Sequence, residues 1–243
     1  MAVREMTKLT FGPIAYHWSA GTLTRERKAT ADFAAMETPE IEINNAAGLY
    51  ARGVRPRRIG SFMNAYNEAT IERMAAQGAT HVCLPAELPG PAIAVAVRAA
   101  RDLGIGVQVF GRASLAVSAR CYPARAHGRT KDICQFVCEE DADGMPLRTR
   151  NDASILRVNG IQTQSESYLG LLPETPRLVV DGVTHLRLMP QDVGLVAVAG
   201  LFRAVLDGGW TQGKRRRALA CSGVTRGSAT GFITARQGIG ESP

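Results

Sequence analysis

Three of the five cysteines of the chain, Cys121, Cys134 and Cys138, lie in one segment with the spacing C-x12-C-x3-C. Positive charge lowers the pKa of a thiol and favours the thiolate, which is the form that binds metals. Three neighbouring cysteines are too many for one disulfide and one fewer than a closed four-cysteine site. We interpret them as part of a zinc or iron–sulfur site, with incidental cysteines as the alternative. The basic residues around them are Arg112, Arg120, Arg125, Arg129 and Lys131.

The composition favours one globular domain with a sizeable core, since 45% of the 243 residues are hydrophobic and 21% are charged. No apolar run approaches the roughly 20 residues that span a bilayer. The first residues, Met1–Pro13, lack the apolar region of a signal peptide. We therefore expect a cytoplasmic location, with the cysteines reduced rather than paired in disulfides.

The formal net charge of +7 comes in part from the basic run Lys214–Arg217. Such a run is either a solvated tail or a contact for RNA or an acidic partner. No aromatic residue interrupts it, so stacking on bases is not supported there. We expect residues 210–243 to form a basic, weakly ordered tail.

Strands and helices alternate along the rest of the chain. Long apolar runs without a period of two favour a parallel sheet covered by helices. We predict a TIM-barrel-like parallel α/β domain over residues 1–209, with a long cysteine loop over residues 112–152. About seven strands are visible, fewer than the eight of a closed barrel, so the barrel is expected to be incomplete or distorted. The predicted strands are 9–14, 40–44, 59–62, 80–84, 105–111, 154–158 and 185–189, and the clearest helices are 67–77, 91–103 and 192–206.

Polar residues follow several predicted strands, where functional residues of parallel barrels lie. Asn64, Asn67 and Glu87 are candidates for binding a polar small molecule in the barrel mouth. Asn67 is equally suited to cap the following helix. Arg112 and Arg120 are candidates for holding an anionic substrate, with compensation of thiolate charge as the alternative.

The cysteine segment SARCYPARAHGRTKDICQFVCEEDADGMPLR, followed by VNGIQT, resembles the collagenase-like peptidase family U32. Within that family it is most similar to the UbiV group, the accessory proteins of anaerobic ubiquinone biosynthesis. The resemblance continues through IGSFMNAYNEATIERMAAQGATHVCLPAEL and VQVFGR and ends near residues 201–209. An earlier GP-x-x-x-x-W stretch, ending at Trp18, matches the start of the family's barrel, where His17 is expected to be structural.

The resemblance implies that the three cysteines are ligands of a [4Fe–4S] cluster, for which soft thiolates are suitable donors. The family's first ligand lies in a VCSKR-like motif that is absent from this sequence, together with two strand–helix units. That leaves the fourth ligand unidentified. Cys83 is interpreted as a small buried hydrophobe, Cys221 as a surface thiol and His127 as an exposed loop residue, although each has a ligating side chain.

The resemblance also implies a function. The chain is expected to be an iron–sulfur accessory subunit for oxygen-independent hydroxylation in ubiquinone biosynthesis. It would act as a heterodimer with a UbiU-like protein, and a lipid-carrier protein would present the quinone precursor. The alternatives are an RNA-base hydroxylation factor of the same family and a non-catalytic partner-binding remnant. Peptidase activity is not expected, because no Ser/His/Asp arrangement or H-E-x-x-H motif is visible.

Overall fold

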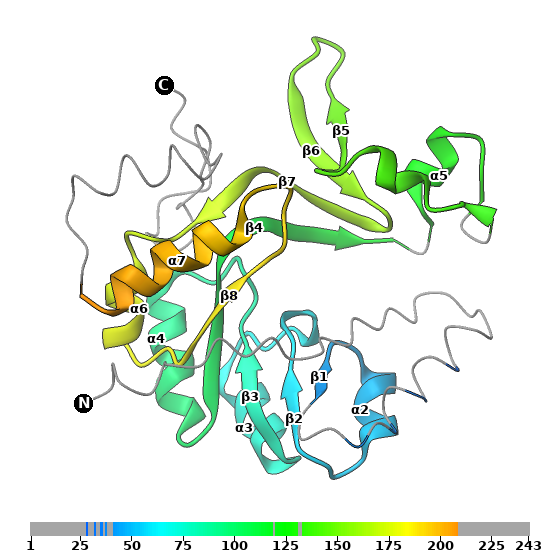
Figure 1. Ribbon diagram of the computed structural model, residues 1–243. Coiled ribbons are helices and arrows are strands. Elements are labelled where there is room, and N and C mark those ends of the chain that lie inside the picture. Colours follow the sequence, from blue (N-terminus) through cyan, green and yellow to red (C-terminus); the bar gives the residue numbers. More distant parts are fainter. Residues whose placement is uncertain are drawn as a thin grey trace. The chain divides into compact units, whose positions relative to one another are not determined.

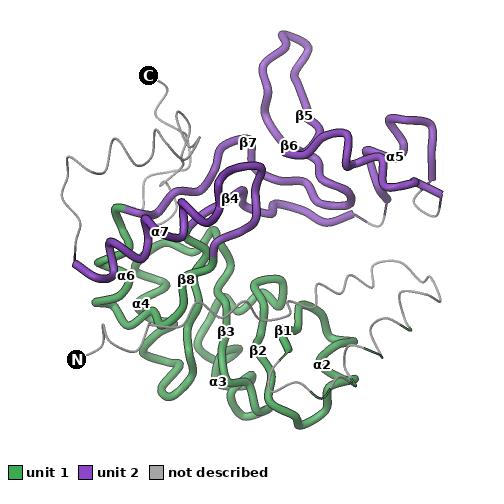
Figure 2. Tube along the Cα trace, viewed as in Figure 1, with its two compact units in different colours: residues 1–109, 173–187, 231–239 green, residues 110–172, 188–230, 240–243 purple. Residues whose placement is uncertain are grey.

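The computed structural model of the chain describes residues 41–118, 120–130 and 133–208, together with residues 28, 32, 35 and 37. These residues form two compact units, coloured separately in Figure 2. Unit 1 contains residues 41–109 and 173–187, and unit 2 contains residues 110–172 and 188–208. Several predictions lie outside the described residues, namely those for strand 9–14, His17, Lys131, Lys214–Arg217, Cys221 and the tail 210–243.

Unit 1 alternates strands and helices, as the sequence predicts (Figure 1). Its two asparagine N-caps explain where two of the helices begin. Asn45 and Asn67 have extended backbones, and their side-chain oxygens accept the amides of Gly48 at 2.7 Å and Thr70 at 2.9 Å. The elements are β1 Ile41–Ile43, α2 Ala46–Arg52, β2 Arg57–Ile59, η2 Ser61–Met63, α3 Glu68–Ala76, β3 Ala79–Cys83, α4 Gly90–Ala100, the first half of β4 Gly104–Val117, α6 Thr175–Val180 and β8 His185–Leu188.

The strands of unit 1 form a parallel sheet. β1 pairs with β2, β2 with β3 and β3 with β4, each in parallel. Gly106 accepts the amide of Leu84 after β3, whereas the neighbouring carbonyl of Ile105 accepts the amide of Thr184 before β8. Successive carbonyls of a strand point to opposite sides, so β3 and β8 flank β4. The strand order is therefore β1-β2-β3-β4-β8.

This sheet is curled. Arg187 of β8 forms a salt bridge with Glu42 of β1, although the two strands lie at opposite edges. In a flat sheet they would be about 19 Å apart, because neighbouring strands are about 4.8 Å apart. Two side chains do not bridge that distance, so the edges must approach each other. Unit 1 is thus a partial barrel, and no strand pairing joins β1 to β8 within the described ranges.

Apolar side chains fill the space between the sheet of unit 1 and its helices. α3 packs against α4 and β3, and its Ile71 is completely buried. Val82 and Ile105 from neighbouring strands are buried as well, as is Ile93 of α4. Each such side chain contributes about 1.5–3 kcal/mol of stability when fully buried. This packing holds the carboxyl ends of the strands in place.

Unit 2 is built on an antiparallel sheet, which differs from the prediction. β4 continues beyond Gly111 and pairs antiparallel with β7, followed by β6 and β5. The prediction of a parallel strand at 154–158 was therefore wrong in its direction, and two strands were missed. The remaining elements are α5 Tyr122–Ala126, η4 Val137–Glu140, β5 Met145–Arg148, β6 Ser154–Asn159, β7 Gln162–Gly170 and α7 Leu195–Leu206.

The helices are short throughout the described residues. α7, with 12 residues, begins after Gly194, so Asp192 is not its N-cap as predicted. None of the helices described is long and apolar enough to cross a bilayer.

Candidate functional site

Unit 2 brings the three predicted cysteines together. Cys121 directly precedes α5, Cys134 lies in the turn before η4, and Cys138 is part of η4. α5 and η4 pack against each other. Cys121 is 7% exposed and Cys134 is partly buried. The small apolar cluster around them consists of Cys121, Ala124 and Val137, with Cys134 and Ile161 packed against it.

The turn between Cys134 and Cys138 is held by backbone geometry and by one arginine. Gln135 and Phe136 both have positive φ angles, 51° and 54°, which reverse the chain direction. Arg129 donates to the carbonyl oxygen of Cys134 at 3.0 Å. Cys134 is thereby held next to the cluster of Cys121, Ala124 and Val137.

The three thiols interact electrostatically. Burial raises the pKa of Cys138, and the neighbouring thiols of Cys121 and Cys134 raise it further, because adjacent thiolates repel each other. A bound metal ion would reverse this effect, since it stabilises the coordinating thiolates. The donor set is therefore chemically suited to a soft metal or an iron–sulfur cluster.

The set is incomplete in two respects. Among the described residues, no three side chains of His, Cys, Asp or Glu are arranged so that they could hold a metal ion. In addition, each described candidate for a fourth ligand either interacts with another group or lies outside the cysteine cluster. His127 donates from Nδ1 to the carbonyl oxygen of Pro123 at 2.9 Å, and its Nε2 lies 3.6 Å from the Glu140 carboxylate. Cys83 belongs to unit 1, where burial raises its pKa to about 11.

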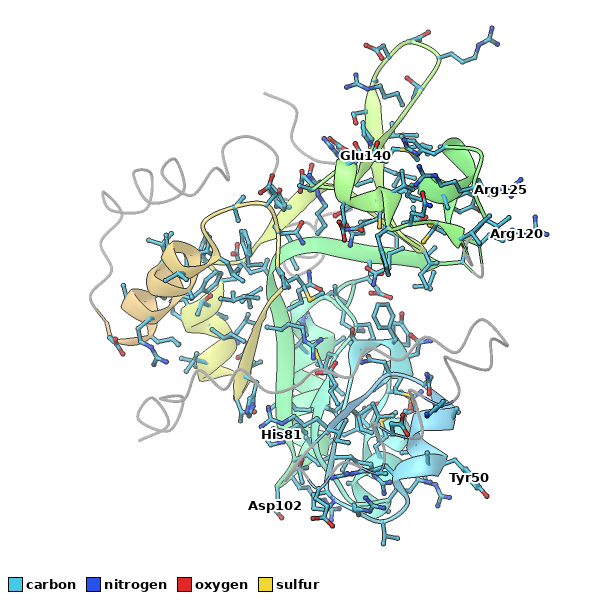
Figure 3. The ribbon with its side chains drawn as sticks, turned by 45° about the vertical axis from the view of Figure 1, so that its right-hand side comes forward. Tyr50, His81, Asp102, Arg120, Arg125 and Glu140 are labelled. Carbon is cyan, nitrogen blue, oxygen red and sulfur yellow. The ribbon has the colours of Figure 1, made fainter. Side chains whose placement is uncertain are left out.

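The two arginines predicted to bind an anion have different environments. Arg120 is exposed, and its side chain extends outward in Figure 3. Arg112 is only 4% exposed and lies within β4 rather than at the end of a strand. It forms a salt bridge with Asp143 and donates to the carbonyl of Ser165 at 3.0 Å. Arg112 is thus engaged inside the protein.

Asp143 and Tyr168, both partly buried, complete the network around Arg112, and neither was predicted from the sequence. The hydroxyl of Tyr168 donates to Asp143 at 2.8 Å, and the guanidinium of Arg112 lies 4.4 Å from the centre of the tyrosine ring. Burial alone would raise the pKa of Asp143, but hydrogen bonds from Arg112 and Tyr168 outweigh it and lower the pKa. Burial and the bond to Asp143 raise the pKa of Tyr168 to about 12. The network anchors the chain just after Cys138 onto β4 and β7.

A second ion pair in unit 2 was also missed. Arg157 of β6 and Glu166 of β7 form two hydrogen bonds, at 2.9 and 3.1 Å. The bonds to Glu166 raise the pKa of Arg157. This pair links two neighbouring strands of the antiparallel sheet.

The candidates in unit 1 are exposed. Asn64 has a positive φ of 55° at the end of η2, and Asn67 caps α3, so the capping role predicted as an alternative is confirmed. Glu87 accepts a hydrogen bond from the hydroxyl of Tyr66. This bond, with burial, raises the pKa of Tyr66 to about 12. The structure thus brings Glu87 to Tyr66, a residue that the sequence analysis did not single out.

The family model described as Peptidase family U32 matches residues 56–241. The chain therefore belongs to peptidase family U32. The matched residues extend from the residue before β2 through both units and include the three clustered cysteines. No solved structure matches the chain.

Proposed function

We propose that the chain is an iron–sulfur accessory subunit of the UbiV group. It acts with a UbiU-like partner in oxygen-independent hydroxylation of ubiquinone precursors, which a lipid-carrier protein presents. The grouping of Cys121, Cys134 and Cys138 in unit 2 is the observation that supports this proposal most directly. Membership of family U32 and the UbiV-like spacing of these cysteines support it independently.

In this proposal the three cysteines hold an iron–sulfur cluster through their thiolates. When bound, the cluster supplies the electron or oxygen-atom transfer that amino-acid side chains cannot perform. The apolar contacts of Ala124, Val137 and Ile161 keep water from the sulfur of Cys121. Arg129 holds the backbone at Cys134 through its bond to the carbonyl oxygen of that residue.

Arg112 has a supporting role in the proposed site. Its charge is matched by Asp143, so the pair adds no net charge to unit 2. The exposed Arg120 and Arg125 are available to compensate the negative charge of thiolates or of a cluster. They are also available to a partner or an anionic substrate, as the sequence analysis expects for Arg120.

Complementation tests the proposal. In a bacterium that lacks its own UbiV-type gene, the chain should restore ubiquinone synthesis without oxygen, provided that a UbiU-like partner is present. Cys134→Ala should abolish the restoration at an equal protein level. Val180→Ala, which shortens a side chain that is 79% exposed, is the control and should restore synthesis fully. Restoration by Cys134→Ala would contradict the cluster role and favour a non-catalytic, partner-binding function.

A further inference from the structure

Unit 1 contains a buried polar group on its curled sheet, apart from the cysteine cluster. Glu42 of β1 is 8% exposed, Asn44 directly after β1 is 5% exposed, and the side chain of Arg187 of β8 is 14% exposed. These residues lie at or near the carboxyl ends of their strands. In parallel β/α barrels, ligands bind at this end of the sheet.

One atom of this group lacks a partner. The side-chain nitrogen of Asn44 donates to Glu42 at 3.0 Å, but its oxygen Oδ1 is buried and accepts no hydrogen bond from any described residue. Buried acceptors are almost always paired, because an unpaired one loses its hydrogen bond to water without compensation. The Oδ1 atom of Asn44 therefore indicates where a hydrogen-bond donor would bind.

Gly60 explains how the sheet accommodates the side chain of Asn44. It follows β2 and donates its amide to the carbonyl of Ile43 at 2.8 Å. A Cβ atom at Gly60 would lie only 1.9 Å from Oδ1 of Asn44 and 2.4 Å from its Cγ. Only glycine therefore permits the position of Asn44, and any larger residue would displace the unpaired oxygen.

The charges around Asn44 restrict what can bind. Glu42 is matched by Arg187, so a cation gains little there and an anion would face the Glu42 carboxylate. The thiol of Cys83, on which the charges of Arg187 and Glu42 act, stays neutral because burial raises its pKa. Oδ1 of Asn44 and the carboxylate of Glu42 are two neighbouring acceptors. A neutral NH2 group offers two donors to such a pair.

We propose that Glu42, Asn44 and Arg187 form a binding site for a small neutral molecule that carries an NH2 group, such as a primary carboxamide or an amino-heterocycle. One N–H donates to Oδ1 of Asn44 and the other to the carboxylate of Glu42. Arg187 holds Glu42 in place and matches its charge. This site lies in unit 1 and does not depend on the function proposed for the cysteines.

Ligand-observed NMR with three matched probes tests the charge and donor requirement on the full-length chain. Benzamide carries a neutral NH2 group, benzoate replaces it with a carboxylate, and benzylamine replaces it with a cation. The proposal predicts saturation transfer to benzamide, and at least fivefold weaker binding of the other two. That ratio corresponds to about 1 kcal/mol, at 1.4 kcal/mol for each tenfold change in Kd. Equal binding of the three probes, or no binding of benzamide, would overturn the proposal.

Two variants locate the site. Asn44→Leu keeps a similar shape but removes the acceptor, and Gly60→Ala displaces the Asn44 side chain. Each should weaken benzamide binding at least about fivefold, which is about 1 kcal/mol. Gly200→Ala is the matched control, because an added Cβ meets no atom within 4 Å in α7. Circular dichroism establishes that each variant is folded. Unchanged benzamide binding in a folded Asn44→Leu chain would overturn the assignment.

Discussion

The network of Arg112, Asp143 and Tyr168 gives a quantitative prediction for Tyr168→Phe. The substitution removes the hydroxyl that donates to Asp143 at 2.8 Å but keeps the aromatic ring. The contact of the ring with the Arg112 guanidinium at 4.4 Å and its stacking on Phe110 at 5.9 Å are therefore retained. The change removes the hydroxyl with its bonds to the Asp143 carboxylate and to Arg112, and leaves the ring in place.

The expected loss in the free energy of unfolding depends on how deeply Asp143 and Arg112 are buried. Hydrogen bonds to charged groups contribute about 1.5–3 kcal/mol when buried. Asp143 is 27% exposed, so water replaces part of the lost bond, and we expect a loss of about 1–2 kcal/mol. Asp143→Asn should cost more, about 3 kcal/mol, because it leaves the guanidinium of Arg112, which is 4% exposed, without its counter-ion.

Thermal unfolding followed by circular dichroism measures these effects. For a chain of this size, Tyr168→Phe should lower Tm by roughly 2–8 °C. Tyr50→Phe is the control, since Tyr50 is 91% exposed and points outward in Figure 3. In the Asp143→Asn background, Tyr168→Phe should cost less than it does alone, because its acceptor has lost its charge. Equal Tm values for Tyr168→Phe and Tyr50→Phe, or full additivity with Asp143→Asn, would refute the network.

Three further predictions concern acid stability, thiol reactivity and packing. Arginine hydrogen bonds outweigh the effect of burial and hold the folded pKa values of Asp143 and Glu166 below 3.8 and 4.5, their ordinary values. The two carboxylates therefore stabilise the folded chain above these values, and this stabilisation is lost as pH falls through the folded pKa values. Urea titrations across this pH range should show that the free energy of unfolding of Asp143→Asn falls less steeply with pH than that of the unchanged chain. In metal-free protein, iodoacetamide at mildly alkaline pH should modify Cys134 before Cys83, because Cys83 is buried and its pKa is about 11; mass spectrometry showing the reverse order would contradict this. Ile71→Val, at a fully buried position, should lower the free energy of unfolding by about 0.5–1.5 kcal/mol, and an unchanged urea midpoint would argue against the packing of α3.

Local signals in the sequence predicted much of unit 1. Asn67 is followed by an amphipathic helix, and apolar runs such as Thr80–Leu84 indicate buried parallel strands, so these elements appear near their predicted positions. Unit 2 depends on long-range pairing and was harder to predict. β7, Gln162–Gly170, is mostly polar, and its strand conformation is stabilised by partners on β4 and β6.

The end of β4 shows why a local signal failed. Gly111 was predicted to end the strand, and glycine does interrupt regular pairing there, with a φ of 103° and register shifts that follow it. The strand nevertheless continues to Val117, because β7 pairs with it on the far side of the irregularity. An added Cβ at Gly111 would lie 2.6 Å from the Cβ of Met189, so glycine serves close packing as well. A single sequence does not distinguish this role from a strand end.

The candidate sites also differ in how far they could be predicted from local sequence signals. The three cysteines are close in the sequence and carry a distinctive side chain, so their grouping could be predicted from spacing. The pair of Glu42 and Arg187 joins residues that are far apart in the chain, and neither belongs to a motif. Only the curl of the sheet brings them together. Arg112 was predicted to hold an anionic substrate or to compensate thiolate charge, whereas in the structure it pairs with Asp143, which no local pattern indicated.

Iron and acid-labile sulfide in protein purified without oxygen test the central claim most directly. The proposal predicts close to four irons and four sulfides for each chain, with a broad visible absorption band that bleaches on reduction. Cys134→Ala should lose most of the iron, whereas Val180→Ala should retain it. Zinc in place of iron would indicate a structural site. Folded protein without iron, or a Cys134→Ala variant with its full iron content, would contradict the assignment of Cys121, Cys134 and Cys138 as cluster ligands.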